Sequence, residues 1–429
     1  MEKNLKFDTK LLHAGSNPKE QKMSINVPIY PSTAFDFGDV QRGADLFDLK
    51  CAGDIYTRLS NPTNNILEAR LSSLEGGVGA LSLSSGMAAI TAAILNIVQS
   101  GENVVTASNL YGGTFNLFNH TFKKLGINVK FAQGEEPEDF EKLIDNKTKC
   151  IYMELLSNPA LNIIDIEKLA QIAHNNNIPL IVDNTIPTPY LCKPIEWGAD
   201  IIIHSTTKYI SGHGNAMGGA IIDSGKFDWK NSGKFPELTE PDESYHGIIY
   251  TEAFNNMAYI VKARVQQLRD MGACPSPFNS YLTLIGLETL SLRMERHSNS
   301  ALKIAEYLEQ HPLISWVNYP MLKSSKYHTL AQKYTPKGCS SIIGFGIKGG
   351  AVAGEKFINN LQIPIHTTNI GDSRSIITYP ALTTHRQLNK EEKIACGVTD
   401  DFMRLSVGLE DIADLIEDIN QALEKSQEL

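Results

Sequence analysis

One lysine of this sequence stands where an amine could react with a carbonyl compound. Lys208 follows the short apolar run 201–203 and is flanked by the hydroxyl groups of Ser205 and Thr207. A β-branched apolar run predicts a buried strand, and ligands of α/β proteins bind at the carboxyl ends of such strands. The amine could form a Schiff base, while the hydroxyls bind a phosphate of the same compound. Taken alone, the pattern also fits a solvated lysine in a flexible glycine-rich loop.

Three further groups follow predicted strands. Gly86 and Met87 lie in a small-residue turn that opens a predicted helix, where free backbone N–H groups and the positive helix end bind anions. Tyr111 could stack on a flat ring, and Asp183 could pair with a ring nitrogen. Each group also has a simpler interpretation. Gly86 and Met87 could form only a tight turn, Tyr111 could be a packing contact, and Asp183 could cap a helix or turn. In this order along one chain, however, the groups have the chemistry needed to hold a phosphorylated pyridine aldehyde.

Strands and helices are predicted to alternate around these residues, which favours a mostly parallel sheet flanked by helices. The predicted strands are 80–83, 104–107, 129–132, 150–155, 180–182 and 201–203. The predicted helices are one that starts at 62 and ends before 76, and then 87–98, 114–125, 137–144 and 166–175. The fold class is therefore α/β.

The pattern changes after 219. A polar and aromatic region over 224–262 precedes a long predicted helix, from 277 to about 309, that we expect to form the spine of a second domain. Shorter elements predict an α+β unit, with strands near 315–319, 342–347 and 376–378 and helices over 351–361 and 411–424. We expect three parts, namely an extended N-terminal arm over 1–60 that contacts a neighbouring subunit, an α/β domain over 61–265 and a smaller α+β domain over 266–429.

Composition limits the possible partners. The 429 residues exceed the roughly 250–300 residues at which a single hydrophobic core stops growing, so we expect two domains. A net charge of −9 without a long Lys/Arg cluster argues against nucleic acid or an anionic membrane as partner. Six scattered cysteines without a CxxC pair suggest neither a disulfide framework nor a zinc site, so we expect no metal and a reducing cytoplasm. A charged N-terminus and the lack of a long apolar run predict neither a signal peptide nor a membrane span.

These motifs resemble those of the Cys/Met-metabolism family of pyridoxal-phosphate (PLP) enzymes, which have fold type I. The resemblance covers nearly the whole chain, and the motifs that carry it are Tyr56-x-Arg58, Ser85-Gly86-Met87, Tyr111-Gly112, Glu154 with Asn158-Pro159, Asp183-Asn184, Ser205-x-Thr207-Lys208 and the run 404–411. It implies a PLP-dependent transferase.

The resemblance also implies a role for each motif residue. Lys208 would hold the cofactor as a Schiff base, Asp183 would pair with the pyridine nitrogen, and Tyr111 would stack on the ring. The phosphate would be held by Gly86, Met87, Ser205 and Thr207, and by Tyr56 and Arg58 of the neighbouring subunit. Arg404 would pair with the substrate α-carboxylate, for which a planar bidentate donor is suited, and further substrate contacts would come from Asn158, Asn369 and Tyr56.

Other segments are similar to the O-acetylhomoserine sulfhydrylase branch of the family, namely 224–229, 244–247, 269–272 and 369–372. Gly113 stands where methionine γ-lyases usually carry Cys. The resemblance thus implies an enzyme of methionine biosynthesis that replaces acetate by sulfide or methanethiol, giving homocysteine or methionine. Lys208, once released from the cofactor, would act as base at Cα and then at Cβ of the substrate, and acetate would leave from Cγ.

Alternative functions stay open at this point. A methionine γ-lyase or cystathionine γ-lyase would use the same residues, as would a γ-synthase that takes O-succinylhomoserine, and a PLP-binding scaffold would lack turnover. Tyr379 stands where many relatives have His, so the acyl donor is not determined by the motifs. The family resemblance further implies a cytoplasmic homotetramer, built from dimers with shared active sites.

Overall fold

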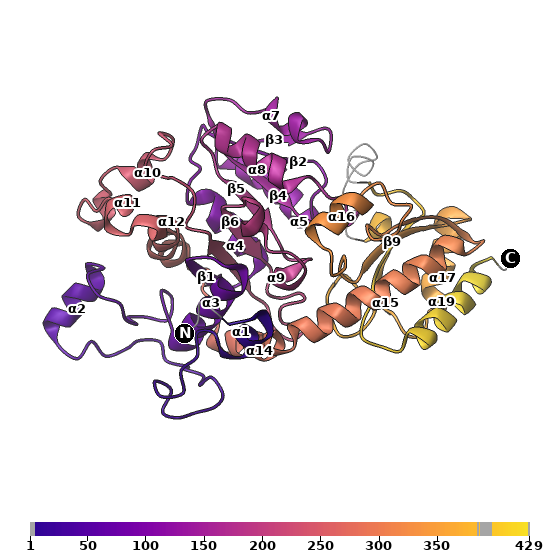
Figure 1. The fold of residues 1–429 in the computed structure, drawn as a ribbon, viewed down its shortest axis with the longest axis horizontal. Coiled ribbons are helices and arrows are strands. Elements are labelled where there is room, and N and C mark those ends of the chain that lie inside the picture. The colour runs from indigo at the N-terminus through magenta and orange to yellow at the C-terminus, as the bar shows by residue number, and fades with distance from the viewer. Residues whose placement is uncertain (1–4, 384–385, 387–396, 428–429) are drawn as a thin grey trace.

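Two β-sheets organise the molecule (Figure 1). The computed structural model describes residues 5–383, 386 and 397–427. Among these residues, one sheet has the strand order β1-β7-β6-β5-β4-β2-β3 and the other has the order β10-β11-β12-β9-β8. The strands of the first sheet lie between 79 and 223, and those of the second between 314 and 406. The predicted domain limits at 60 and 265 stay predictions.

The first sheet is mostly parallel, as predicted. Its strands are β1 (Gly79–Leu83), β2 (Asn103–Ala107), β3 (Asn128–Ala132), β4 (Thr148–Glu154), β5 (Leu180–Asp183), β6 (Ile201–His204) and β7 (Gly219–Asp223). Strand β7 is antiparallel to both of its neighbours, β1 and β6. Every other pair of neighbouring strands, from β6 through β5, β4 and β2 to β3, is parallel. The carboxyl ends of all strands except β7 therefore meet at one edge, where α/β proteins bind ligands.

Strand β7 is absent from the sequence prediction. It begins at Gly219, directly after Gly218, and the glycine pair indicated a turn rather than a strand. The structure shows a different reason for glycine here, because a Cβ on Gly219 would lie 2.0 Å from the carbonyl oxygen of Ser85. The strand therefore packs tightly against the turn that precedes α4 (Gly86–Leu95).

Helices flank the first sheet and begin and end at recognisable caps. Asn61 caps α3 (Pro62–Glu75), Pro62 occupies its first turn, and Gly76 ends it in the left-handed conformation with φ +86°. The predicted helix 114–125 is helical to 124 and contains a π-helical stretch over 117–121. The remaining helices before β6 are α5 (Gly112–Asn116), α6 (Phe122–Lys124), α7 (Pro137–Glu141), α8 (Ile166–Asn175) and α9 (Thr188–Leu191).

The N-terminal arm contains two short helices, α1 (Phe7–His13) and α2 (Val40–Phe47). Helix α1 packs on α3 through the buried Leu11, and Nε of Arg70 donates to the carbonyl of Ala14 at 3.0 Å. Helix α2 lies away from the sheet at the lower left of Figure 1, and its Val40 and Phe47 are exposed. The first part of the arm therefore rests on its own chain, whereas α2 leaves apolar side chains uncovered.

A break divides the long helix that was predicted over 277–309. The structure has α14 (Pro277–Glu288) and α15 (Leu290–Gln310), separated at Thr289. The carbonyl of Gly286 accepts from the N–H of Thr289 at 3.3 Å and from Nη2 of Arg293 at 2.6 Å, which diverts it from the regular helical bond. The short helices that precede α14 are α10 (Pro236–Thr239), α11 (Tyr250–Ala253), α12 (Ala258–Lys262) and α13 (Arg269–Met271).

The second sheet is largely antiparallel and lies beyond α15 (Figure 1). Its strands are β8 (Ile314–Asn318), β9 (Ile342–Ile347), β10 (Ile365–His366), β11 (Ile376–Thr378) and β12 (Phe402–Ser406). Helices α17 (Gly350–Asn360) and α19 (Ile412–Ser426) contact each other, and α16 (His328–Tyr334) precedes β9. The predicted elements of this region are present within two residues, but α16, β10 and the buried central strand β12 were not predicted.

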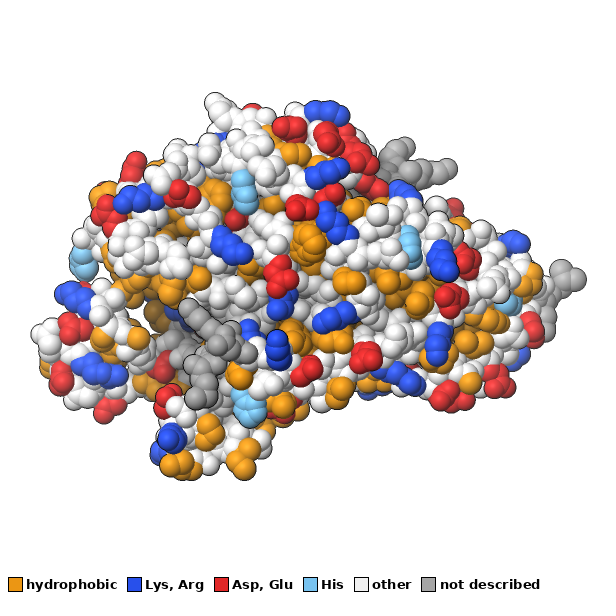
Figure 2. Space-filling view, viewed as in Figure 1, with side chains coloured by type: hydrophobic (Ala, Val, Ile, Leu, Met, Phe, Trp, Pro, Cys, Tyr) orange, Lys and Arg blue, Asp and Glu red, His pale blue; other side chains and the backbone are white. Residues whose placement is uncertain are grey.

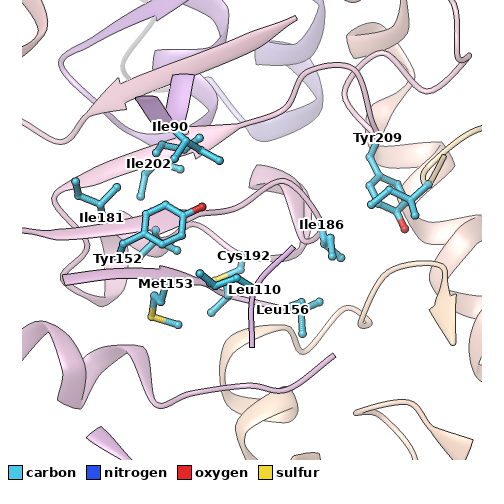
Figure 3. Close-up of a cluster of buried hydrophobic side chains, with 14 of the residues drawn as sticks. Ile90, Leu110, Tyr152, Met153, Leu156, Ile181, Ile186, Cys192, Ile202 and Tyr209 are labelled. Atoms are coloured by element: carbon cyan, nitrogen blue, oxygen red, sulfur yellow. The ribbon is translucent and has the colours of Figure 1, made fainter. Parts of the chain in front are cut away.

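Apolar side chains from β4, β5, β6 and α4 form the core beside the carboxyl edge of the first sheet (Figure 3). Tyr152, Ile181 and Ile202 come from three adjacent strands, and each has no exposed surface. Burial of apolar surface contributes about 25 cal/mol per Å², so this packing holds the strand ends, and the side chains that follow them, in fixed positions.

The surface is mixed in charge. Figure 2 shows acidic and basic side chains interspersed over one face, with hydrophobic side chains in small groups between them. Within the described part of the chain, no helix combines the length and the apolar character that a membrane crossing requires.

Candidate active site

A pocket of about 400 Å³ lies at the carboxyl edge of the first sheet, and Thr368, Ile370 and Arg404 from the second sheet and its connections close its other side. This volume is in the usual range for small-molecule and cofactor sites. The structure brings most of the predicted site residues into its lining, namely Gly86, Met87, Tyr111, Asn158, Asp183, Ser205, Thr207, Lys208 and Arg404.

One end of the pocket is suited to an anion. Gly86 and Met87 are the first residues of α4, and their N–H groups have no intrahelical acceptor because the preceding turn is not helical. The hydroxyl of Ser205 lies against this helix start, since a Cβ on Gly86 would be 2.6 Å from Cβ of Ser205. Glycine is therefore required here for close approach. The N–H groups of Gly86 and Met87 and the helix dipole favour a bound phosphate, and these groups with the Ser205 hydroxyl are called the anion cradle below.

The side chain of Thr207 fixes the loop that carries Lys208. Its Oγ1 donates to the carbonyl of Gly218 at 3.1 Å and accepts from the N–H of the same residue at 3.0 Å. The two bonds join the chain before Lys208 to the start of β7. The loop between β6 and β7 is therefore fixed by hydrogen bonds between its two ends.

Lys208 lies inside the pocket and contacts the connection between β10 and β11. Its Nζ donates to Oδ1 of Asn369 at 2.7 Å. Burial, together with the positive charge of Arg404, lowers the pKa of the Lys208 amine to about 8. A substantial fraction of the amine is thus unprotonated at mildly alkaline pH, and only the neutral amine is a nucleophile or a base.

Asp183 ends β5 and lines the pocket. Its Oδ1 accepts from the N–H of Thr185 at 2.9 Å, and its Oδ2 accepts from the hydroxyl of Tyr152 at 3.3 Å. Burial raises the pKa of the Asp183 carboxyl. A cationic partner such as a protonated ring nitrogen would lower it again, because a nearby opposite charge favours the ionised form.

Tyr111 and Asn158 are joined through one carboxyl group. The N–H of Tyr111 donates to Oε1 of Glu154 at 2.7 Å, and the N–H of Asn158 donates to Oε2 at 3.0 Å. Tyr111 is 45% exposed and borders the pocket, so its ring is free to cover a flat ligand. Burial and the charge of Asp183 raise the pKa of Glu154.

Arg404 reaches the pocket from β12 and is 3% exposed. Its Nη1 donates to Oδ1 of Asn158 at 2.8 Å, and its Nη2 lies 3.4 Å from the carbonyl oxygen of Asn369. The buried Nε has no hydrogen-bond partner among the described residues. Burial lowers the pKa of Arg404 to about 10, which still leaves it cationic at neutral pH. A buried cation with an unused donor is suited to a carboxylate.

Three predicted site residues lie outside the lining of this pocket. Asn369 is one of them, although its Oδ1 accepts from Nζ of Lys208 at 2.7 Å. Tyr56 and Arg58 are exposed, and the Arg58 guanidinium lies 5.2 Å from the centre of the Tyr56 ring. Neither side chain lines the pocket of its own chain. Their assignment to the phosphate of a neighbouring subunit stays a prediction.

Sequence reasoning missed several residues of the site region, including Thr368 and Ile370. Thr185 lines the pocket, and its Oγ1 accepts from the N–H of Ser205 at 2.8 Å. Its position two residues after Asp183, at a strand end, was a usable signal. His204 and Glu75 form a fully buried contact of 2.6 Å on adjoining elements, but they are 129 residues apart and nothing in the sequence pairs them.

Comparisons with known proteins agree with this geometry. A model of the family described as Cys/Met metabolism PLP-dependent enzyme matches residues 8–424, nearly the whole chain. The chain belongs to this family. It is a PLP-dependent enzyme, as predicted, and the anion cradle, the amine of Lys208 and the carboxyl of Asp183 fit the phosphate, aldehyde and ring nitrogen of PLP.

Individual members of the Cys/Met family align along the full length. An O-acetyl-L-homoserine sulfhydrylase from Leptospira meyeri is 49% identical, over 99% of this chain and 98% of its own. A homocysteine/cysteine synthase from Saccharomyces cerevisiae is 47% identical over 97% of both chains. An O-acetyl-L-homoserine sulfhydrylase from Thermus thermophilus is also 47% identical, over 98% of this chain and the whole of its own.

A solved structure of the family has the same fold. It is described as an O-acetylhomoserine (thiol)-lyase from Campylobacter jejuni, is 41% identical and superposes with a TM-score of 0.95, covering 98% of this chain and all of its own. One lysine of that protein carries a pyridoxyl phosphate group. The prediction of a fold type I PLP enzyme is confirmed.

Proposed function

We propose that this protein is an O-acetylhomoserine sulfhydrylase, which replaces the acetate of O-acetylhomoserine by sulfide or a small thiol such as methanethiol. The observation that carries the proposal is the similarity, over nearly the whole chain, to relatives that are named for this activity. The pocket supports it, since one cavity holds an amine, a buried cation and an anion cradle. The products would be homocysteine or methionine.

Arg404 and Asn158 bind and orient the amino-acid substrate in this proposal. The guanidinium binds the α-carboxylate, while Asn158, through its 2.8 Å contact with Nη1, fixes the plane of the guanidinium. Planar paired donors match a carboxylate better than the point charge of a lysine. The substrate is thus held with its α-carbon toward the reactive amine.

Lys208 moves the protons of the reaction. A pKa of about 8 leaves part of the amine neutral near neutral pH, so it removes the proton from Cα and then from Cβ. The acceptor Asn369 lies 2.7 Å from Nζ and stabilises the amine when it carries the proton. Acetate leaves from Cγ, the thiol adds at the same carbon with loss of its proton, and Lys208 returns protons to Cβ and Cα to complete the exchange.

The bound cofactor supplies an electron-withdrawing ring, which makes the protons at Cα and Cβ removable. Gly86, Met87, Ser205 and Thr207 would hold its phosphate, and Asp183 would pair with its ring nitrogen. Tyr111 would cover the ring and exclude water from that side. These roles use the side chains that the pocket brings together.

The proposal includes an assembly. Each pocket would be completed by Tyr56 and Arg58 of a second subunit, because these residues lie outside the pocket of their own chain, on an arm that carries the exposed Val40 and Phe47. A homotetramer built from two such dimers fits the family resemblance. A location in the reducing cytoplasm fits the scattered cysteines, which form no CxxC pair.

An activity matrix tests the proposal. The donors are O-acetylhomoserine, O-succinylhomoserine and O-acetylserine, and the acceptors are sulfide and methanethiol. We expect the highest kcat/KM in the row of O-acetylhomoserine, with one acetate released per thioether or thiol formed. Preference for O-succinylhomoserine would identify a γ-synthase, and ammonia release from methionine without thiol would identify a lyase.

A further inference from the structure

The carboxyl of Glu154 accepts a backbone hydrogen bond on each of its oxygens. Glu154 is the last residue of β4 and is 7% exposed. Oε1 accepts from the N–H of Tyr111 at 2.7 Å, and Oε2 accepts from the N–H of Asn158 at 3.0 Å. One buried group therefore joins the turn after β2 to the turn after β4.

Both turns carry side chains that face the pocket. The ring of Tyr111 borders it on one side, and Oδ1 of Asn158 accepts from Nη1 of Arg404 at 2.8 Å. A continuous series of contacts thus runs from Tyr111 through Glu154 and Asn158 to Arg404 on β12 of the second sheet. We propose that Glu154 is a positioning residue that sets the cofactor-covering ring and the carboxylate-binding arginine in one fixed arrangement.

The chemistry of the site requires a carboxyl group. Two N–H donors point at the two terminal atoms of the Glu154 side chain, and within the described residues neither donor has another acceptor. A carboxylate offers an acceptor on each oxygen, whereas an amide offers one oxygen and one NH₂ donor. Glutamine would leave one backbone N–H facing a donor, which costs more than the loss of an ordinary hydrogen bond.

A matched control lies outside the pocket. Asp418 on α19 is 6% exposed, and its carboxyl accepts from the backbone N–H groups of Gln362 and Ile363 at 2.9–3.1 Å. It also joins two segments through backbone N–H groups, but it does not line the pocket. The pair Glu154→Gln and Asp418→Asn therefore separates positioning of the site from loss of a buried carboxyl.

Three quantities would be measured for each variant. The first is the Kd for PLP, from absorbance titration of the apoprotein, and the second is the midpoint of apoprotein unfolding. The third is the Kd for O-acetylhomoserine, from the change in the visible spectrum of the loaded protein. Only the third rests on the proposed function. If O-acetylhomoserine causes no spectral change in the wild type, the proposed function is contradicted, while the PLP titration still tests the role of Glu154.

We expect Glu154→Gln to weaken PLP binding about fivefold or more and to weaken substrate binding by a similar factor. Asp418→Asn should lower the unfolding midpoint and leave both dissociation constants unchanged. Combining Glu154→Gln with Arg404→Lys should give less than the sum of their effects on substrate binding, since both act on one series of contacts.

Equal dissociation constants in Glu154→Gln and wild type would overturn the proposal, and so would equal losses in Glu154→Gln and Asp418→Asn. Should Glu154→Gln fail to fold, Glu154→Asp keeps both acceptors on a shorter side chain. It is then expected to weaken PLP binding in the same direction by a smaller factor, and unchanged PLP binding in that variant would also overturn the proposal.

Discussion

The Nζ of Lys208 donates a hydrogen bond of 2.7 Å to Oδ1 of Asn369, from the loop after β6 of the first sheet to the connection between β10 and β11 of the second. Both parts of the molecule therefore position the amine. The bond favours the protonated amine, whereas burial and the charge of Arg404 favour the neutral one and bring its pKa to about 8.

This contact predicts how Asn369 controls the protonation of Lys208. Recombination of the apoprotein with PLP requires the neutral amine, so its rate should rise as the pH increases through about 8. Asn369→Leu removes an acceptor for the charged form and should move the inflection to lower pH. Asn369→Asp adds a negative charge and should move it to higher pH. Stopped-flow absorbance measures the rates, and one common inflection for all three proteins would contradict the assignment.

A second prediction concerns the identity of the reactive lysine. The pure protein should be yellow, and borohydride should attach PLP to Lys208, as peptide mapping would show. Lys208→Ala should bind PLP without attachment and without turnover. Lys234 is the control, because burial also lowers its pKa but it lies outside the pocket, so Lys234→Ala should be labelled like wild type. A reduced adduct on any other lysine refutes the role of Lys208.

Arg404→Lys keeps the charge but loses the planar paired donors. Hydrogen bonds to charged groups contribute roughly 1.5–3 kcal/mol, so kcat/KM should fall about tenfold or more while PLP stays bound. Arg374, which follows Asn369 closely in the sequence, is the control. Its side chain is 61% exposed and pairs with Asp372 at 2.9 Å, so Arg374→Lys should leave kcat/KM unchanged. The opposite ranking would assign the carboxylate to Arg374.

Mixed assemblies test whether two subunits share each site. Arg58→Ala and Lys208→Ala chains, each nearly inactive alone, should regain about a quarter of wild-type activity after subunit exchange. Half of the dimers are then mixed, and each mixed dimer has one intact site of two. Lys208 and Arg404 line the same pocket of one chain, so Lys208→Ala mixed with Arg404→Ala should recover nothing. No recovery in the first mixture would show that Arg58 serves its own subunit.

Local patterns were sufficient to predict the edge of the first sheet. The apolar runs before Asp183 and Lys208 end one residue before β5 and β6 end in the structure, and the caps of α3 and α4 stand where their residue types indicated. Short buried strands between polar turns carry a strong signal, because each is bounded by residues that cannot continue it. The anion cradle at Gly86 follows from the same reasoning.

Contacts between distant segments were beyond local reasoning. The pairing of Asn158 with Arg404 spans 246 residues, and that of Lys208 with Asn369 spans 161. Arg404 on β12 and Asn369 in the connection between β10 and β11 were placed at the site by family resemblance alone. Strand β7 and the break at Thr289 were missed because close packing at Gly219 and the bond from Arg293 override the local preference.

The sulfide dependence of acetate release tests the proposed function most directly. With O-acetylhomoserine and sulfide, we expect acetate and homocysteine to form in equal amounts, with little ammonia, and Lys208→Ala to form neither. In a parallel assay, methionine without sulfide should release no ammonia. Rapid ammonia and 2-oxo acid release from either amino acid, unaffected by sulfide, would contradict the account and identify the protein as a lyase.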